Sequence, residues 1–513
     1  MHQALLIDEI LEVILDSCTE SWTLSRIARS CQAWKDPALD RLWWRISSFK
    51  PLLDLIPGLL CVNGVYVSLD NPVLELPFCP DFRLLQCYAS RVKQIVYREN
   101  IRLHPTLLSL LLQDHEQACI FRKLSIVQLS LTKCSSLSPI ISLAKGLKTV
   151  ELDLGFKMNN FETVNRTAFD FLTTADRVSS SFDSLSLRGG ASGQVMDSVN
   201  NLSRLKVLHL CVGATLPVET LTAISTFPYL RELEIHTSHI QPEDFILSSQ
   251  GCFPSLHSLN IRGRANSIEK LLQNMRSGNL VALRIDIEPL VYTNNTWGGL
   301  FAAIKEKTYD SLLQLTIEHH MDTQDFSLEN DTPSSPDTTL HPYVDNLLRT
   351  NPNDFLHFEH LHSLSHHRNL RQIVIETTPP ILVRDSDLEQ IVRWWPNLEH
   401  LDLGSVPTFD PRWMPKATLA GLSILSRGLS VLDTLTIPIN SAKLTCDAAT
   451  KSAGNGNGSL RYMTLTASTP PDKSMAHYLH RLFPSIIEIH GTSGHEEHWD
   501  RVQKDFELLK LTE

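Results

Sequence analysis

The stretch Leu205-Lys206-Val207-Leu208-His209-Leu210 carries the pattern that decides the fold of this chain. It reads apolar, two other residues, apolar, one other residue, apolar, and the alternation at its end predicts a short strand with one buried face. The same pattern recurs from about residue 124 onward. Its other copies have their anchors at Ile126/Leu129/Leu131, Leu147/Val150/Leu152, Phe182/Leu185/Leu187, Leu230/Leu233/Ile235, Leu256/Leu259/Ile261, Leu280/Leu283/Ile285, Leu312/Leu315/Ile317, Leu370/Ile373/Ile375, Leu398/Leu401/Leu403, Leu432/Leu435/Ile437 and Leu460/Met463/Leu465.

The spacing of these copies indicates a repeat. From Leu185 to Leu283 the central anchors follow one another at intervals of 23, 25, 26 and 24 residues. The stretch before several copies reads as an amphipathic helix that ends at a break such as Phe253-Pro254. One strand plus one helix per roughly 20–29 residues is the leucine-rich-repeat unit, which buries its apolar edge by stacking on its neighbours. A dozen copies favour this unit over unrelated strands of an ordinary α/β domain.

The repeats are irregular, so the predicted α/β solenoid is uneven. The intervals widen to 32, 58 and 34 residues after Leu283, Leu315 and Leu401. The Asn that a regular ladder has three places after the last anchor is replaced, for example by Gly213, Ser238 and Arg264. The widest interval contains an acidic, proline-bearing stretch at about 321–345, which we expect to be an exposed, mobile loop. The Gly-rich stretch 453–459 is predicted to be a flexible linker.

Composition excludes several classes of protein. Of 513 residues 42% are apolar, and 46 Lys and Arg stand against 57 Asp and Glu, a net charge of −11. This balance argues against general nucleic-acid binding, which needs a basic surface. No apolar run approaches the roughly 18 residues of a membrane span. The ten cysteines contain no C-x-x-C pair, which is typical of buried thiols in a reducing compartment. We therefore expect a cytoplasmic and/or nuclear chain that binds no membrane.

The first 47 residues differ from the rest and predict three short helices. Ile7, Ile10, Leu11, Ile14 and Leu15 form the apolar stripe of a first helix. The stripe of a second contains Leu24, Ile27, Ala28, Cys31 and Trp34, and Asp36-Pro37 is read as the start of a third. So small a unit buries little surface by itself, which suggests that part of this face is reserved for a partner. The alternative is a cap that covers the end of the repeats.

Three segments of the N-terminal region resemble the F-box. They are Leu6-Ile7-Asp8-Glu9-Ile10-Leu11-Glu12-Val13-Ile14, Leu24 to Ala28, and Ser30-Cys31-Gln32-Ala33-Trp34, although Ile7 stands where that motif usually has proline. Later blocks are similar to the fungal F-box proteins with degenerate leucine-rich repeats: Tyr88-Ala89-Ser90-Arg91-Val92, Trp394-Trp395-Pro396-Asn397-Leu398-Glu399, Thr418-Leu419-Ala420-Gly421-Leu422 and Trp499-Asp500-Arg501-Val502. The resemblance covers nearly the whole chain.

This resemblance implies a substrate-recognition subunit of a Skp–cullin–F-box ubiquitin ligase, a non-catalytic receptor that docks a Skp-type adaptor, and through it a cullin, and presents a protein target. The alternative is a leucine-rich-repeat interaction scaffold without a link to ubiquitin ligation. Carried over residue by residue, the adaptor-binding face consists of Leu6, Ile7, Ile10, Leu11, Ile14, Leu24, Ile27, Ala28, Cys31 and Trp34. The central strand positions of the repeats are the candidates for binding the target, namely His209, Glu234, Asn260, Arg284 and Asp402.

No pattern in the sequence predicts catalysis or a cofactor. The richest histidine cluster is 357–367, in which His362 and His366 would lie one turn apart on a helix. A metal-dependent enzyme would need a third ligand there, and we favour a solvated helix face with Leu356, Leu361 and Leu364 turned inward. The stretch 495–498 is not H-E-x-x-H and is read as a polar turn before a terminal helix.

The predicted organisation follows from these readings. We expect an F-box-like helical domain at 1–47, a helical or irregular connector and cap at 48–123, the irregular repeat domain at 124–491 and a C-terminal helical cap at 492–513.

Overall fold

A computed structural model gives the arrangement of the chain in two compact units, Met1–Leu230 and Arg231–Glu513. The structure describes residues 7–62, 65–68, 81–99, 101–103, 105–113, 120–134, 137–156, 160–213, 216–244, 252–276, 278–288, 297–319, 356–377, 380–404, 414–440, 456–467, 471, 474–492 and 496–512. Leu6 and the acidic stretch 321–345 lie outside these residues.

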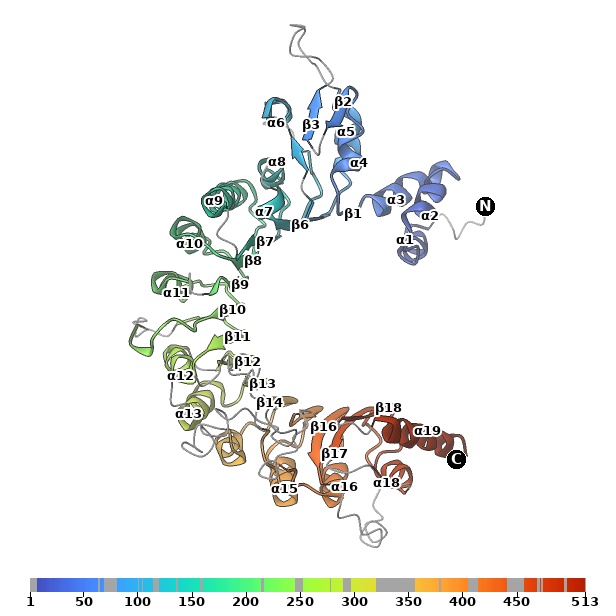
Figure 1. Ribbon diagram of the computed structural model, residues 1–513, viewed down its shortest axis with the longest axis vertical. Coiled ribbons are helices and arrows are strands. Elements are labelled where there is room, and N and C mark those ends of the chain that lie inside the picture. The colour runs from blue at the N-terminus through green and yellow to red at the C-terminus, as the bar shows by residue number, and fades with distance from the viewer. Residues whose placement is uncertain are drawn as a thin grey trace, which may run out of the picture. The chain divides into compact units, whose positions relative to one another are not determined.

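The first unit is built on a parallel sheet in which each strand pairs with the next along the chain (Figure 1). Its strands are β1 (Arg45–Ile46), β4 (Gln94–Tyr97), β6 (Ile126–Ser130), β7 (Thr149–Gly155), β8 (Ser184–Gly189) and β9 (Val207–Cys211). A small separate sheet consists of β2 (Leu59–Val62), β3 (Val65–Ser68) and β5 (Arg102–Leu103), with β2 and β3 antiparallel.

Helices precede and follow these strands. In the first unit they are α1 (Asp8–Asp16), α2 (Ser21–Ala28), α3 (Gln32–Leu42), α4 (Lys50–Leu53), α5 (Arg83–Ala89), α6 (Pro105–Gln113), α7 (Leu131–Cys134), α8 (Ser138–Ser142), α9 (Phe161–Val178), α10 (Gly193–Asn200) and α11 (Val218–Ile224). The first three helices, which carry the predicted adaptor-binding residues, come directly before β1.

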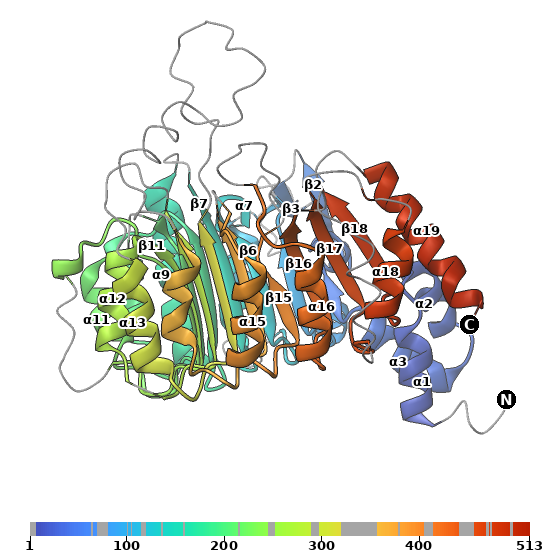
Figure 2. The ribbon, with the colours of Figure 1, turned by 90° about the horizontal axis from the view of Figure 1, so that it is seen from below.

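The second unit repeats the same strand-and-helix arrangement. Its parallel strands are β10 (Glu232–His236), β11 (Ser258–Gly263), β12 (Ala282–Ile287), β13 (Gln314–His319), β14 (Gln372–Thr377), β15 (His400–Asp402), β16 (Thr434–Ile439), β17 (Tyr462–Ala467) and β18 (Glu488–Thr492). Its helices are η3 (Pro242–Asp244), α12 (Ala265–Asn274), α13 (Trp297–Thr308), η5 (Phe358–Leu364), α15 (Asp385–Trp394), α16 (Leu419–Gly428), α18 (Met475–Leu482) and α19 (Glu496–Thr512). Figure 2 shows α12, α13, α15 and α16 along one face of the strands.

The alternation of each strand decides which side chains enter the core. In β10, Leu233 and Ile235 are fully buried, and Glu234 between them is not. The apolar stripe of each helix closes over the same side, as Leu271 and Leu272 of α12 show by their complete burial. All twelve patterned copies form strands, β6 to β17, so the leucine-rich-repeat fold is confirmed.

Three more strands belong to the parallel sheets although the pattern did not locate them. Strands β1 and β4 lie before residue 124, where we expected the repeats to begin. Strand β18 follows the last patterned copy. The terminal helix α19 begins at Glu496, so the predicted polar turn at 495–498 is wrong for its last three residues, which are helical.

A different polar ladder replaces the missing Asn ladder. In several repeats of the second unit, the residue directly before the first anchor donates a side-chain hydrogen bond to a backbone carbonyl one repeat earlier. Asn279 Nδ2 lies 2.7 Å from Pro254 O, and Asn397 Nδ2 lies 3.1 Å from Arg368 O. Ser311 Oγ donates to a different carbonyl, that of the anchor Leu280, at 2.7 Å. These bonds tie neighbouring repeats of the second unit together.

Candidate docking surface on the N-terminal helices

Helix α1 begins at Asp8 even though Ile7 occupies the usual proline position. Ile7 has an extended backbone, and its carbonyl accepts a hydrogen bond from Leu11 N at 3.0 Å, which starts the helix. No side chain caps this end. The amphipathic stripe of α1 is therefore formed with isoleucine in that place.

The three helices have a small core of their own. Its buried members are Leu11, Leu15, Leu24, Ala28 and Ala38. Partly buried apolar side chains pack against them, namely Cys18, Ile27, Trp34, Leu39 and Leu42. The three helices bury these side chains against one another, so their burial does not require a partner protein.

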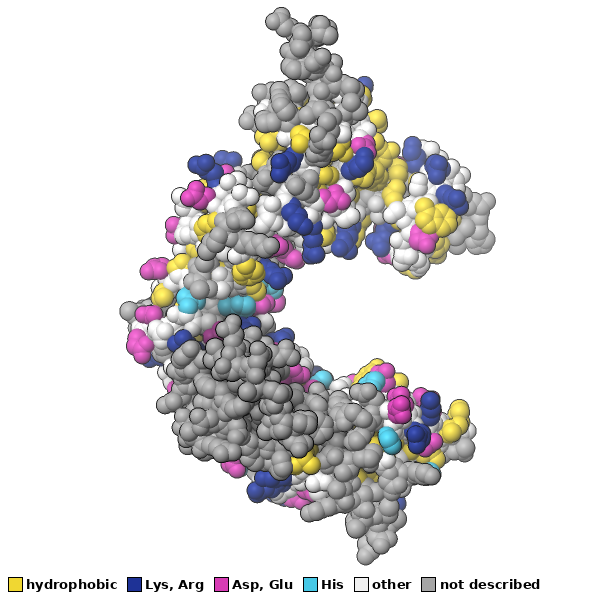
Figure 3. Space-filling view, in the orientation of Figure 1, with side chains coloured by type: hydrophobic (Ala, Val, Ile, Leu, Met, Phe, Trp, Pro, Cys, Tyr) yellow, Lys and Arg dark blue, Asp and Glu magenta, His cyan; other side chains and the backbone are white. Residues whose placement is uncertain are grey.

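Other apolar side chains of the same helices remain in water. Ile7 is 47% exposed, Ile10 40%, Val13 67% and Trp22 56%. Arg26 lies over the ring of Trp22, 4.6 Å from its centroid. Figure 3 shows hydrophobic side chains on the surface of this helical segment. Large exposed apolar groups in so short a segment are typical of interaction surfaces.

The ten residues predicted to bind an adaptor thus separate into three groups. Leu11, Leu24 and Ala28 are buried in the core of the helices. Ile7 and Ile10 are exposed, and the partly buried members are Ile14, Ile27, Cys31 and Trp34. Leu6 lies outside the described residues. Val13 and Trp22 were not among the ten, since neither falls on the predicted stripes.

The second and third helices begin and end elsewhere than predicted. Helix α2 ends at Ala28, and Cys31 has an extended backbone that precedes α3. Trp34 therefore lies on α3, and Pro37 lies inside that helix instead of in its first turn. The prediction failed because a helical stripe continues across the three-residue break at 29–31 when both helices turn apolar residues to one core.

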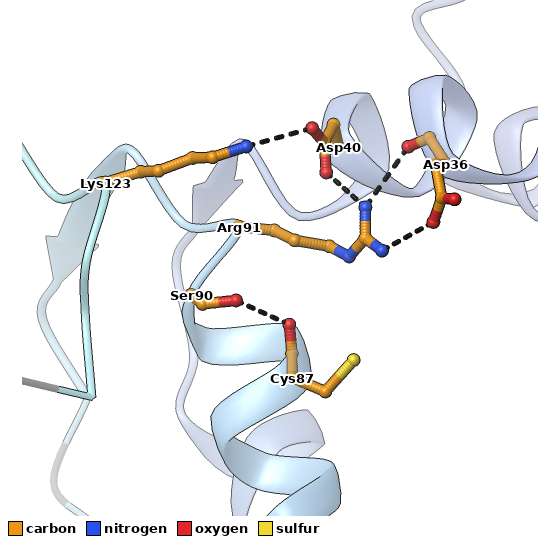
Figure 4. A network of polar contacts seen from close by, with 6 residues as sticks. All are labelled: Asp36, Asp40, Cys87, Ser90, Arg91 and Lys123. Carbon is orange, nitrogen blue, oxygen red and sulfur yellow. Dashed lines mark hydrogen bonds and ion pairs between the residues drawn. The ribbon is translucent and has the colours of Figure 1, made fainter. Parts of the chain in front are cut away.

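A charged network joins α3 to the first repeats (Figure 4). Arg91 Nη2 lies 2.6 Å from Asp36 Oδ1, and Arg91 Nη1 bonds to Asp40. Lys123 Nζ lies 3.1 Å from the other oxygen of Asp40. Arg91 follows α5 and Lys123 precedes β6, so two separate segments hold α3. The side chain of Arg91 is only 17% exposed, which strengthens its ion pairs relative to pairs in open water.

The carboxyl group of Asp40 titrates abnormally because of this network. Its partial burial alone would raise its pKa, but hydrogen bonds from Arg91 and Lys123 outweigh that effect and hold the pKa below its usual value of 3.8. Backbone pairing adds to the junction, since Lys93 N and Gln94 N both donate to Trp44 O, at 3.0 and 2.9 Å. The rings of Trp43 and Tyr88 also lie 5.0 Å apart.

The predicted target-binding residues of the second unit share one row of its sheet. Glu234 is paired in register with Asn260, and Asn260 with Arg284. Through Thr316 and Val374 the row reaches Asp402. His209 occupies the equivalent place on β9, opposite Ser186 of β8, in the first unit.

Two members of this row are engaged by their neighbours. Arg284 forms an ion pair with Glu318 at 2.7 Å. Asp402 accepts a hydrogen bond from Gly404 N at 2.8 Å, while burial raises the pKa of its carboxyl group. Their charges are thus partly satisfied within the repeat sheet.

The histidine cluster packs more tightly than predicted. Leu356, Leu361 and Leu364 are buried, as expected. His367 is also buried, within 3.1 Å of Thr308 Oγ1, so the prediction of a wholly solvated histidine face is wrong. The segment is a 3-10 helix, whose tighter winding changes the expected one-turn spacing. Among the described histidines of 357–367, no three offer ligand atoms close enough to share one ion.

Comparisons with known proteins give only distant structural likenesses. The chain is similar to a chain in the crystal structure of the Rad7 and Elc1 complex in yeast, with a TM-score of 0.41 and 12% identity over 76% of this chain and 84% of that one. It is also similar to the leucine-rich-repeat-containing protein LegL7 from Legionella pneumophila, with a TM-score of 0.33 and 12% identity over 70% and 100%. No family model and no curated protein sequence matches. None of the described helices is both long and apolar enough for a membrane span.

Proposed function

We propose that this chain is the substrate-recognition subunit of a Skp–cullin–F-box ubiquitin ligase. In this proposal α1–α3 dock a Skp-type adaptor, which connects the chain to a cullin, and the repeats bind the protein target. The chain performs no covalent chemistry in such an assembly. It raises the effective concentration of a target lysine near the conjugating enzyme.

One observation carries the proposal. The three N-terminal helices fill their own core and still leave Ile7, Ile10, Val13 and Trp22 in water. A segment that served only to cap the repeats would turn its large apolar groups toward them. Apolar groups at one-turn intervals on a helix are the anchors of helix-in-groove recognition. The resemblance of this segment to the F-box makes a Skp-type adaptor the expected partner.

The junction supports the proposal in a second way. Recognition subunits must hold the target at a defined distance from the reacting groups, since misplacement reduces the rate. The contacts of Arg91 and Lys123 with α3 connect the docking helices to β4 and β6 directly. The adaptor-binding helices and the first repeats are therefore joined by side-chain contacts as well as by the chain.

Co-purification with a Skp-type adaptor tests the proposal. We expect the intact chain to form a stoichiometric complex, and we expect Ile10→Asp to weaken it at least about tenfold, because a carboxylate would be desolvated in the interface. The matched control is Ile487→Asp, which makes the same change at an isoleucine that is 55% exposed before β18. The control should bind like the intact chain.

The outcomes separate the two candidate functions. Both variants alter exposed side chains, so neither should disturb folding. Thermal unfolding curves that match the curve of the intact chain would show this. Loss of the complex in Ile10→Asp alone would support the receptor. If the folded intact chain bound no adaptor, the receptor would be ruled out and the chain would be a leucine-rich-repeat interaction scaffold.

A further inference from the structure

A cavity of about 390 Å³ opens on the strand face of the first unit. Three cationic side chains line it, those of Arg98, Lys133 and Arg188. The carboxylates of Glu151 and Asp153 line it as well. Figure 3 shows Lys and Arg side chains gathered over this part of the unit, near β6 and β7. The lining of this basic cavity thus has an excess of one positive charge, in a chain whose net charge is −11.

The fold brings these residues together from separate repeats. Arg98 directly follows β4, and Lys133 lies in α7, the single helical turn directly after β6. Arg188 lies near the end of β8, in register with Asp153 of β7. Because the strands are parallel and adjacent, their carboxyl ends meet at one edge of the sheet, and the three cations gather there.

The two carboxylates are already engaged by neutral donors. Gln128 Nε2 donates to Glu151 Oε1 at 2.9 Å. Gly155 N donates to Asp153 Oδ1 at 3.1 Å. By contrast, none of the three cations forms an ion pair within the part of the chain that the structure describes. Other basic residues of this unit do pair, such as Arg204 with Asp176 and Lys206 with Asp183.

We propose that this cavity binds an anionic side chain of the target protein, either a phosphate ester or a carboxylate. The inference rests on the proposed function, which makes the repeats a target-binding surface. Guanidinium groups bind such planar or tetrahedral oxyanions with paired hydrogen bonds, and Lys133 adds a point charge. The volume lies within the range of about 300–1,000 Å³ that is usual for ligand sites. The cations are exposed, so the binding is salt-dependent.

Fluorescence anisotropy with three labelled peptides of one sequence tests the inference. Their central residue is phosphoserine, glutamate or serine, and orthophosphate serves as a competitor. We expect saturable binding of the phosphoserine peptide, the glutamate peptide or both, and none of the serine peptide. The arm that binds shows which oxyanion the cavity takes.

Three variants distinguish the cavity from general charge attraction. Arg188→Ala should weaken binding about tenfold, since it removes a charged hydrogen-bond donor. Glu151→Gln should strengthen binding, because it removes a negative charge from the cavity and keeps the shape of the side chain. Arg166→Ala, on the exposed face of α9 and outside the cavity, is the charge-matched control and should have no effect.

Each contrary result overturns the inference. Equal losses of peptide affinity in Arg188→Ala and Arg166→Ala would show that the peptide is attracted only by the net charge of the protein. A folded chain that saturated with neither peptide nor orthophosphate would exclude the site. Failure of the proposed function is distinguishable, because the adaptor experiment uses the N-terminal helices: Ile10→Asp should lose the adaptor and still bind the anionic peptide that the intact chain binds.

Discussion

Arg91 Nη2 lies 2.6 Å from Asp36 Oδ1, and this contact joins the loop after α5 to helix α3. The same guanidinium bonds to Asp40, which Lys123 also contacts. Each carboxylate thus has a cation, and each cation comes from a segment next to a strand of the parallel sheet. The N-terminal helices are therefore attached to the first repeats by charges that lie partly out of water.

Replacing Arg91 should destabilise this junction. Arg91→Met keeps most of the apolar stem of the side chain but leaves Asp36 and Asp40 without their shared cation, so we expect a loss of about 1–3 kcal/mol in the free energy of unfolding. Urea unfolding followed by circular dichroism measures the change. Arg83→Met is the control, because Arg83 pairs with Asp81 in open water and its 88% exposed side chain should contribute nothing measurable. Equal effects of the two substitutions would contradict the role of the junction.

The abnormal pKa of Asp40 predicts how acid acts on the junction. Its pKa in the folded chain lies below the ordinary 3.8, so the unfolded chain binds the proton more readily. The stability that Asp40 contributes is fully present above pH 3.8. It is lost as the pH falls through the pKa that Asp40 has in the folded chain.

Asp40→Asn should therefore be less stable than the intact chain near neutral pH, and the difference should shrink once the pH falls below about 3.8. Urea midpoints of both proteins across this range provide the measurement. A difference that is independent of pH would mean that the ionised carboxylate is not what stabilises the junction.

Truncation of Trp395 should destabilise the chain far more than truncation of Trp22. Trp395 is fully buried and donates from Nε1 to Leu364 O at 3.0 Å, so Trp395→Ala should cost about 3–5 kcal/mol in unfolding free energy. Trp22 is 56% exposed and contacts Arg26, so Trp22→Ala should cost less than about 1 kcal/mol. Guanidinium unfolding distinguishes them. The Trp22→Ala variant should instead lose affinity for the adaptor.

A glycine of β8 should tolerate no side chain. Gly189 has a φ of +111°, and a Cβ there would lie 2.6 Å from backbone atoms of Gly155 on β7. Gly189→Ala should therefore destabilise the chain by about 1–3 kcal/mol. Gly193→Ala is the matched control, because a Cβ at this first residue of α10 meets nothing within 4 Å. It should be neutral or stabilise by up to about 1 kcal/mol. Equal melting temperatures of the two variants would contradict the close approach of β7 and β8.

Most of the fold could be predicted because eleven of the twelve patterned strands bury their anchors in the same way. In β6 the predicted anchors are out of register, since Val127 and Leu129 pair with the anchors Val150 and Leu152 of β7 while Ile126 is only partly buried. The strands that were missed show the limit of the pattern. Val92, Ile95 and Tyr97 around β4 follow the same spacing, but a tyrosine fills the last place, and in β18 that place belongs to Gly491. Asn457 lies in the Gly-rich stretch predicted as a linker and is buried, with its backbone N 2.8 Å from Leu482 O.

The candidate sites were harder to predict than the strands. A stripe identifies the apolar face of a helix, but it does not say which of its members fill the internal core and which stay in water. Leu11 and Ile10 are neighbours on α1, but Leu11 is buried and Ile10 is exposed. The basic cavity left no motif at all, because Arg98, Lys133 and Arg188 are single residues in three different repeats and only the pairing of their strands brings them together.

Because the strands of the second unit pair in register, the place of a residue on the sheet does not depend on the length of its repeat. Glu232 pairs with Ser258 one short repeat away, while Gln314 pairs equally well with Gln372, which follows a much longer connection. Strand pairing, and not the number of intervening residues, decides which side chains stand next to one another. Segments inserted between strands can therefore lengthen or diverge in such a chain without disturbing the row of residues that its sheet displays, so that the connections and the displayed surface are free to evolve separately.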